Sequence, residues 1–338
     1  MRAVPRKRLL LAAGRGVFLV AALGLLAWQV RRDADGAAAA LGRIGLGHGL
    51  LALLAAIVGL GATGLAWRAV LTRLGSPLPV SAVPPVFFVA QIGKYLPGAV
   101  WPYLAQVRLG REYGVPASRS AAASALFVLA HCATGGAVAA AVLPWASPDA
   151  VRRFWWALAL VPVMLATLHP RVMLPLLRRA HALARRGTAP DRLDGGRITG
   201  ALGWLLVAWL CYGASMFALL APVTSGGLAR RGAVALGGYA LGWTVGFCAA
   251  AVLVAAAPAG LGFREVALLA VLAPVLTGGP AAAVVLVSRV VQTLGDAGWA
   301  LAGLAVGRRG RSREQRQDGS REAGEPAPAA SGANDTGV

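Results

Sequence analysis

Two short breaks in apolar segments carry the residues best suited to bind a charged ligand. Lysine occurs only twice in the chain, and Lys94 lies three residues before the pair Pro97 and Gly98. Arg264 and Glu265 follow a second, glycine-rich break. A helix that breaks at membrane depth exposes backbone N–H groups and a dipole end, and these attract an anion together with a nearby cation. The two breaks therefore predict a site for an anionic group, with phosphate as the first candidate.

The glycines at the breaks allow two interpretations. They would let a lipid headgroup approach the backbone closely, or they would serve the close packing of helices that is common in membranes. Lys94 likewise would meet a lipid phosphate, or it would be neutralised by Glu112, Glu265 or Asp296. The candidate substrate-binding residues near the breaks are Lys94, Tyr95, Pro97, Gly98, Arg108, Gly260, Gly262, Arg264 and Glu265.

A polar stripe crosses the last apolar segment. Arg289 is followed by Gln292, Thr293 and Asp296 at offsets of three, four and seven residues, which puts all four on one face of a helix. The stripe either lines a cavity in which Arg289 meets an anion, or forms an internal ion pair that joins two helices. We include Arg289 and Asp296 among the candidate substrate-binding residues.

The composition indicates a membrane protein. Of 338 residues, 57% are hydrophobic and 14% are charged, and the mean hydropathy is +0.66. Several apolar runs reach the ~20 residues that a helix needs to cross a bilayer. Strands of a membrane barrel would alternate in polarity, and these runs do not. We therefore expect an all-α, polytopic membrane protein.

The net charge of +20 would indicate nucleic acid as a partner of a soluble protein. Here the arginines lie mainly in loops and tails between apolar runs, as in the cytoplasmic loops of membrane proteins. We expect no nucleic-acid partner, and we expect attraction to anionic lipid at the inner surface.

The apolar runs predict about eight transmembrane helices. Two pieces too short to cross the membrane, within about 80–112, meet at the first break and have arginines on both outer sides, which predicts a re-entrant hairpin. The expected helices are 9–30, 50–70, 117–143, 154–168, 198–221, 233–256, a shorter helix that ends at Leu276, and 281–306.

The predicted transmembrane domain comprises residues 1–307. Its basic loop 171–197 is expected in the cytoplasm, together with both termini. Residues 308–338 are rich in Arg, Gly, Ser, Glu and Pro, which predicts a disordered tail. The two halves share a Pro-Gly break, a short helix and an Ala-rich span, a layout compatible with an internal repeat.

Catalytic and cofactor motifs are missing from the sequence. It has no phosphate-binding loop, no Gly-x-Ser-x-Gly and no His-Glu-x-x-His pattern. The three cysteines lie singly in apolar runs, and His131 has no second histidine three or four residues away. We expect no catalytic residue, no metal, no cofactor and no enzyme activity.

The motifs Gly-Lys-Tyr-Leu-Pro-Gly at 93–98 and Pro-Ala-Gly-Leu-Gly-Phe-Arg-Glu at 258–265 resemble the lysylphosphatidylglycerol synthase transmembrane family. This flippase-like membrane region occurs in bifunctional aminoacyl-phospholipid synthase/flippases and in stand-alone proteins. The resemblance covers about 9–306 and implies an eight-span, flippase-like fold. Phe263 is bulkier than the aliphatic residue expected there, and the soluble aminoacyl-transfer domain is absent, so lipid synthesis is not expected. The matching residues are Lys94, Tyr95, Pro97, Gly98, Gly260, Gly262, Arg264 and Glu265.

The main hypothesis is a flippase-like protein of the bacterial plasma membrane that binds or moves an anionic, phosphate-bearing lipid. That lipid would be an aminoacyl-phospholipid or a polyprenyl-phosphate-linked sugar. One alternative is a membrane-embedded transferase with Glu112, Glu265 or Asp296 as general base. Another is a non-catalytic partner of a membrane glycosyltransferase.

Overall fold

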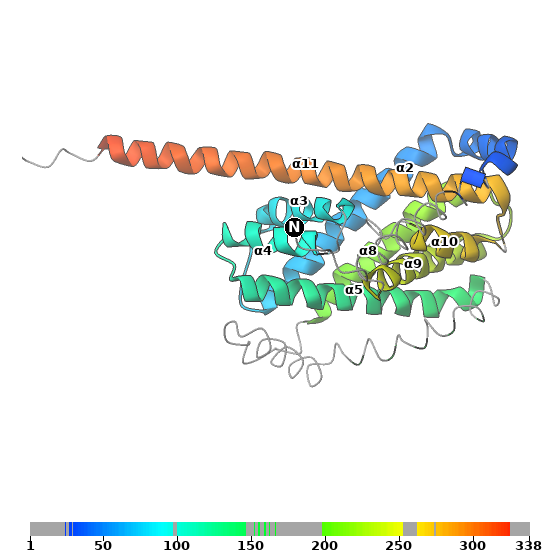
Figure 1. Ribbon diagram of the computed structural model, residues 1–338, viewed down its shortest axis with the longest axis horizontal. Helices are drawn as coiled ribbons and strands as arrows, with labels where there is room; N and C mark the ends of the chain where they lie inside the picture. Colours follow the sequence, from blue (N-terminus) through cyan, green and yellow to red (C-terminus); the bar gives the residue numbers. More distant parts are fainter. Residues whose placement is uncertain are drawn as a thin grey trace, which may run out of the picture.

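The computed structural model is a bundle of helices (Figure 1). It describes residues 30–96, 100–146, 198–252, 262–273 and 275–324, with a few isolated positions between 24 and 166, and within these residues it contains no strand. The main helices are α2 (Ala34–Arg73), α4 (Trp101–Arg111), α5 (Ala117–Ala146), α8 (Ile198–Leu220), α9 (Leu228–Val252), α10 (Phe263–Leu272) and α11 (Gly278–Gly324).

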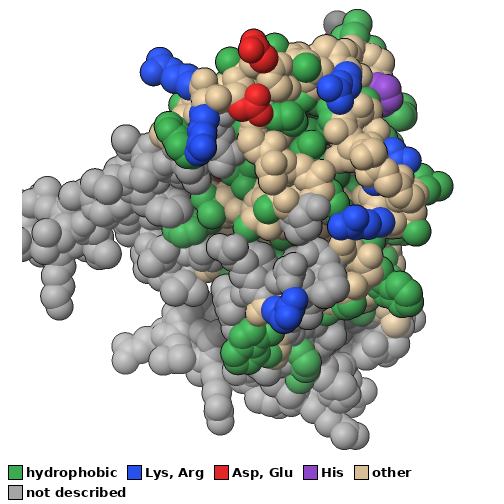
Figure 2. Space-filling view, turned by 90° about the vertical axis from the view of Figure 1, so that its right-hand side faces the viewer, with side chains coloured by type: hydrophobic (Ala, Val, Ile, Leu, Met, Phe, Trp, Pro, Cys, Tyr) green, Lys and Arg blue, Asp and Glu red, His purple; other side chains and the backbone are tan. Residues whose placement is uncertain are grey.

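Four of these helices are long and apolar enough to cross a membrane, within the part of the chain that the structure describes. They are α2, α5, α8 from Thr199, and α11 as far as Arg309. Figure 2 shows hydrophobic side chains at the surface over much of one described face. The predicted helical membrane class is therefore confirmed. The count of about eight spans and the repeat remain predictions. The basic loop 171–197 and most residues of the expected helices 9–30 and 154–168 lie outside the described part of the chain.

Helix α2 begins with a kink and an unusual cap. Gly45 has a φ of +54°, a conformation that glycine adopts without strain. This glycine divides α2 into a short first part and a longer second part. The Asp33 carboxylate caps two helices at once: one oxygen accepts the Gly36 N–H of α2 at 3.1 Å, and the other accepts the Gly279 N–H of α11 at 2.9 Å. Asp33 and Gly279 are 246 residues apart in the sequence. A single carboxylate thus joins the starts of two helices that are distant in the chain.

Replacing Asp33 with alanine is expected to lower the free energy of unfolding by about 1–2 kcal/mol, because both helix starts lose their side-chain acceptor. Thermal unfolding in detergent, followed with a thiol-reactive dye, measures this loss. Asp35→Ala is the matched control, since Asp35 is exposed in the first turn of α2. An equal loss in both variants would contradict the role of the double cap.

The predicted hairpin is present as two helical arms that pack together. The first arm consists of short segments, η1 (Val80–Ala82), η2 (Pro84–Phe88), α3 (Val89–Gln91) and η3 (Ile92–Tyr95), and the second arm is α4. A Cβ added to Gly93 would lie 2.9 Å from the backbone nitrogen of Pro102, so the arms meet closely at this glycine. Residues 97–99 at the tip are outside the described part, and entry of the hairpin into the membrane remains a prediction.

Helices α9 and α10 pack through a row of glycines on α9. Each of three glycines spaced by four residues faces one residue of α10: Gly238 faces Val271, Gly242 faces Leu268, and Gly246 faces Arg264. A Cβ at Gly246 would lie 2.9 Å from the Arg264 Cβ. Small residues at this spacing let membrane helices approach closely. This row of glycines therefore fixes the position of the first turn of α10 against α9.

Helix α11 runs along one side of the bundle and projects beyond it (Figure 1). It continues to Gly324, so the prediction of a disordered tail from 308 onward is wrong for 308–324. Arg, Glu and Gln, which are frequent in this segment, have high helix propensity, and extending an existing helix avoids the cost of nucleation. The next proline is Pro326, beyond the end of the helix.

Candidate functional site

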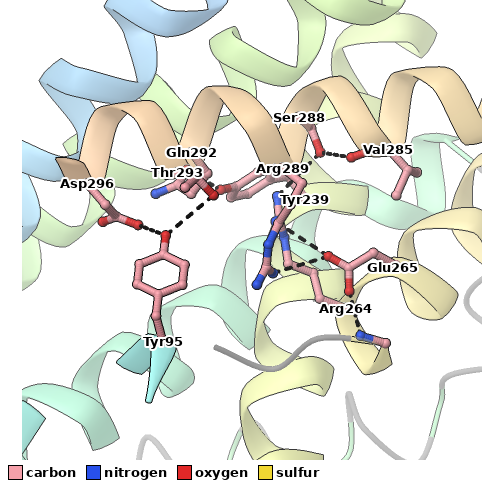
Figure 3. A network of polar contacts seen from close by, with 11 residues as sticks. Tyr95, Tyr239, Arg264, Glu265, Val285, Ser288, Arg289, Gln292, Thr293 and Asp296 are labelled. Atoms are coloured by element: carbon pink, nitrogen blue, oxygen red, sulfur yellow. Dashed lines mark hydrogen bonds and ion pairs between the residues drawn. The ribbon is translucent and has the colours of Figure 1, made fainter. Parts of the chain in front are cut away.

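A partly buried polar network lies where the hairpin, α9, α10 and α11 meet (Figure 3). It joins side chains that are far apart in the sequence, and two of its contacts are ion pairs between elements. We call these residues the polar network: Lys94, Tyr95, Tyr239, Arg264, Glu265, Ser288, Arg289, Gln292, Thr293 and Asp296.

At the hairpin end of the network, Asp296 of α11 receives two contacts from η3. The Lys94 Nζ lies 2.6 Å from Asp296 Oδ2, and the Tyr95 hydroxyl donates to the same oxygen at 2.7 Å. The Lys94 ammonium also lies 5.5 Å from the centre of the Tyr95 ring, within the range of a cation–π contact. The Asp296 side chain is only 3% exposed, whereas that of Lys94 is 28% exposed. The cation of this pair is therefore the partner that solvent reaches.

At the other end, Glu265 ties the start of α10 to α11. Its Oε2 accepts the Gly262 N–H at 2.8 Å, and its Oε1 accepts a hydrogen bond from Arg289 Nη1 at 3.2 Å. Gly262 has a φ of +92°, which glycine adopts without strain. The Gly262 turn thus places the Glu265 carboxylate both as a cap of α10 and as the partner of Arg289.

Arg264 is the most deeply buried cation of the network, with 5% of its surface exposed. Its guanidinium lies 5.1 Å from the centre of the Tyr239 ring and donates to Ser288 Oγ at 3.4 Å. Its nearest carboxylate oxygen, Glu265 Oε1, is 3.9 Å away, and its buried Nε has no hydrogen-bond partner. Tyr239 is held in turn by a 2.8 Å hydrogen bond to Gln292. Arg264 therefore keeps hydrogen-bonding capacity that the protein does not use.

The formal charges of the network do not cancel. Among the residues that the structure describes here, Lys94, Arg264 and Arg289 contribute three positive charges, and Glu265 and Asp296 contribute two negative charges, which leaves an excess of one positive charge. Burying an uncompensated charge is costly unless a ligand or water offsets it. The network is thus suited to hold one additional negative charge.

The predicted stripe on α11 is found as expected: Arg289, Gln292, Thr293 and Asp296 all turn toward the network (Figure 3). Both of its charged residues form internal ion pairs, and of the three carboxylates considered for Lys94, the structure pairs it with Asp296. This pairing does not test a role in substrate binding, which stays a prediction.

The other predicted site residues have different positions. Arg108 is exposed on α4, and no contact between it and the network is found among the described residues. Gly262 forms the turn before α10. Pro97, Gly98 and Gly260 fall outside the described residues.

Sequence reasoning missed Tyr239 and Ser288. Ser288 precedes Arg289 and lies four residues before Gln292, so the helical period that identified the stripe also includes it. Tyr239 lies alone among apolar residues of α9, and no local pattern distinguishes it from a core aromatic residue. Its role depends on the packing of α9 against α10.

No group of three or more His, Cys, Asp or Glu side chains that could hold a metal ion occurs within the described residues.

A family model, described as the lysylphosphatidylglycerol synthase TM region, matches residues 13–297. The matched range contains the hairpin and every residue of the polar network. The comparison with curated proteins gives no match.

Proposed function

Since this chain belongs to the family of the lysylphosphatidylglycerol synthase TM region, we propose that it binds an anionic, phosphate-bearing lipid and moves the lipid headgroup between leaflets. The lipid is an aminoacyl-phospholipid or a polyprenyl-phosphate-linked sugar. The membrane is the bacterial plasma membrane, with both termini in the cytoplasm, as the basic segments favour.

The excess positive charge of the polar network carries this proposal. A phosphodiester group has one negative charge, which brings the sum of the network charges to zero. Arg264 has a buried Nε without a partner, and a guanidinium donates well to phosphate oxygens. The headgroup phosphate therefore finds an unsatisfied donor and an uncompensated charge at the same place.

The exposure of the three cations gives a direction of approach. The side chains of Lys94 and Arg289 are 28% and 17% exposed, whereas Arg264 is almost completely buried. A headgroup meets Lys94 or Arg289 first and reaches Arg264 by moving inward. The glycine row of α9 holds the Arg264 backbone in place while its side chain takes up the ligand.

Replacing Arg264 with alanine is expected to lower the rate of headgroup translocation at least tenfold, because a charge-assisted hydrogen bond is worth ~1.5–3 kcal/mol. The measurement uses proteoliposomes that contain phosphatidylglycerol with a fluorescent headgroup. Dithionite, which stays outside, destroys only the fluorescence of lipids that reach the outer leaflet.

The matched control is Arg111→Ala, which removes an exposed arginine at the end of α4 and is expected to leave the rate unchanged. Thermal unfolding of both variants shows whether they are folded. If a folded Arg264→Ala protein translocates lipid as fast as the unsubstituted protein, the proposed role of the network is wrong.

A further inference from the structure

We infer that Asp296 is an internal substitute for the lipid phosphate: it occupies Lys94 and Tyr95 when no lipid is bound, and the phosphate displaces it. This inference rests on the proposed function and assigns a competing role to one carboxylate of the polar network. An anionic headgroup must therefore bind strongly enough to displace Asp296 before it can pair with the Lys94 ammonium.

The contacts of Asp296 have the form expected for a phosphate oxygen. A single oxygen, Oδ2, receives both the Lys94 ammonium at 2.6 Å and the Tyr95 hydroxyl at 2.7 Å. An oxygen of a phosphodiester accepts the same two contacts, because it also carries a partial negative charge and several lone pairs. Either anion therefore satisfies the two donors, but one oxygen position cannot be filled by both.

The type of cation favours exchange between the two anions. Lysine has a compact ammonium on a flexible stem and makes contacts as a point charge, whereas arginine forms a rigid, two-pronged pair with a carboxylate. Lys94 is also the more exposed member of its pair. Its ammonium can turn from Asp296 to a ligand at the surface without passing through the core.

The hairpin segment that carries Lys94 depends on these polar contacts. No residue of η3 is buried, and Ile92 and the adjacent Leu96 are 39% and 53% exposed. Apolar packing therefore contributes little to the attachment of this segment to α11. When a phosphate takes Lys94 and Tyr95 from Asp296, η3 loses its ion pair and its 2.7 Å hydrogen bond with α11.

The charge balance is favourable for the displaced state. Lys94 and one phosphodiester form a neutral pair, and the remaining charges of Arg264, Arg289, Glu265 and Asp296 also sum to zero. The Asp296 carboxylate thus stays in a region with a matching number of cations after it leaves Lys94.

The first test measures hydrogen exchange by mass spectrometry on the purified full chain in detergent. Asp296→Asn is expected to raise amide exchange in the peptide that covers 89–96, because the asparagine side chain holds the ammonium less strongly. Asp35→Asn, which removes an exposed carboxylate from the first turn of α2, is the control and is expected to leave this peptide unchanged. Unchanged exchange in Asp296→Asn would overturn the inference.

The second test measures binding of dihexanoyl-phosphatidylglycerol, a short-chain soluble lipid, by the change in intrinsic tryptophan fluorescence. Asp296→Asn is expected to bind this probe about fivefold more tightly, since a partly exposed ion pair no longer competes with it. Inorganic phosphate at the same concentrations is expected to bind more weakly than the lipid. If it binds equally well, the assignment to a lipid headgroup is wrong.

The outcomes separate this inference from the proposed function. Equal or weaker binding of the lipid by Asp296→Asn, with clear binding by the unsubstituted protein, overturns the competing role and leaves the proposed function intact. Absence of binding by both proteins overturns the proposed function as well. If Asp296→Asn does not fold, Tyr95→Phe replaces it in the exchange test: this variant keeps both charges, loses one hydrogen bond to Asp296, and is expected to raise exchange in the 89–96 peptide by a smaller amount. Its affinity for the lipid is not expected to rise, because the hydroxyl also donates to the phosphate, and unchanged exchange would overturn the inference.

Discussion

Replacing Glu265 with alanine is expected to lower the free energy of unfolding by about 3–5 kcal/mol. The substitution leaves the buried Arg264 and the partly buried Arg289 without their carboxylate. It also removes the side-chain acceptor of the Gly262 N–H at the start of α10. The loss of a buried counter-charge is the main cause of the destabilisation, and the missing cap adds to it.

Thermal unfolding in detergent measures the effect of Glu265→Ala. Glu265→Gln is expected to lose less stability, because its amide oxygen still accepts the Gly262 N–H. Asp35→Ala serves as the control, since it removes an exposed carboxylate. If Glu265→Ala unfolds at the same temperature as this control, Glu265 does not stabilise the arginines.

Replacing Gly303 with alanine is expected to destabilise the protein by about 2–3 kcal/mol, because α11 contacts the hairpin through this glycine. An added Cβ would lie 2.7 Å from the Pro84 carbonyl carbon and 2.9 Å from Val89 Cγ2. The Pro84 carbonyl belongs to the backbone of η2 and cannot turn away as a side chain does. The Phe88 and Trp299 rings, stacked with centres 4.6 Å apart, hold the same two elements together and would have to separate.

The same helix offers a matched control for Gly303→Ala. Gly298 is exposed, and a Cβ added there meets no atom within 4 Å. Gly298→Ala is therefore expected to be neutral or to stabilise by up to ~1 kcal/mol, as alanine is the better helix former. Equal unfolding temperatures of the two variants would show that Gly303 is not needed for the contact between α11 and the hairpin.

The two ion pairs of the network have different roles. We propose that Asp296 competes with the ligand, whereas Glu265 stabilises the structure. The Lys94–Asp296 pair has an exposed, flexible cation, whereas Glu265 is held by a backbone N–H and two arginines. We expect substitutions at Asp296 to change ligand affinity and hairpin exchange more than stability. Substitutions at Glu265 are expected to act first on stability.

The sequence by itself determined the helical membrane class and the polar stripe of α11. Both depend on local properties: an apolar run long enough to span a bilayer must satisfy its backbone internally, and offsets of three, four and seven residues share one helix face. Pro97 and Gly98 predict a break in the same way, and they lie outside the described residues. The helix from 308 to 324 was missed because composition alone does not show that α11 is already formed and extends into this segment.

Only the tertiary structure decided which charges meet. Lys94 lies 202 residues from Asp296 and had three carboxylates available as partners, so its ion pair depends on how the hairpin packs on α11. Tyr239 joins the site because the glycines of α9 let α10 approach closely enough to bring Arg264 over its ring. Such contacts arise from long-range packing, which residue type and local spacing do not specify, and they turn a set of candidate residues into a network whose described charges sum to one positive charge.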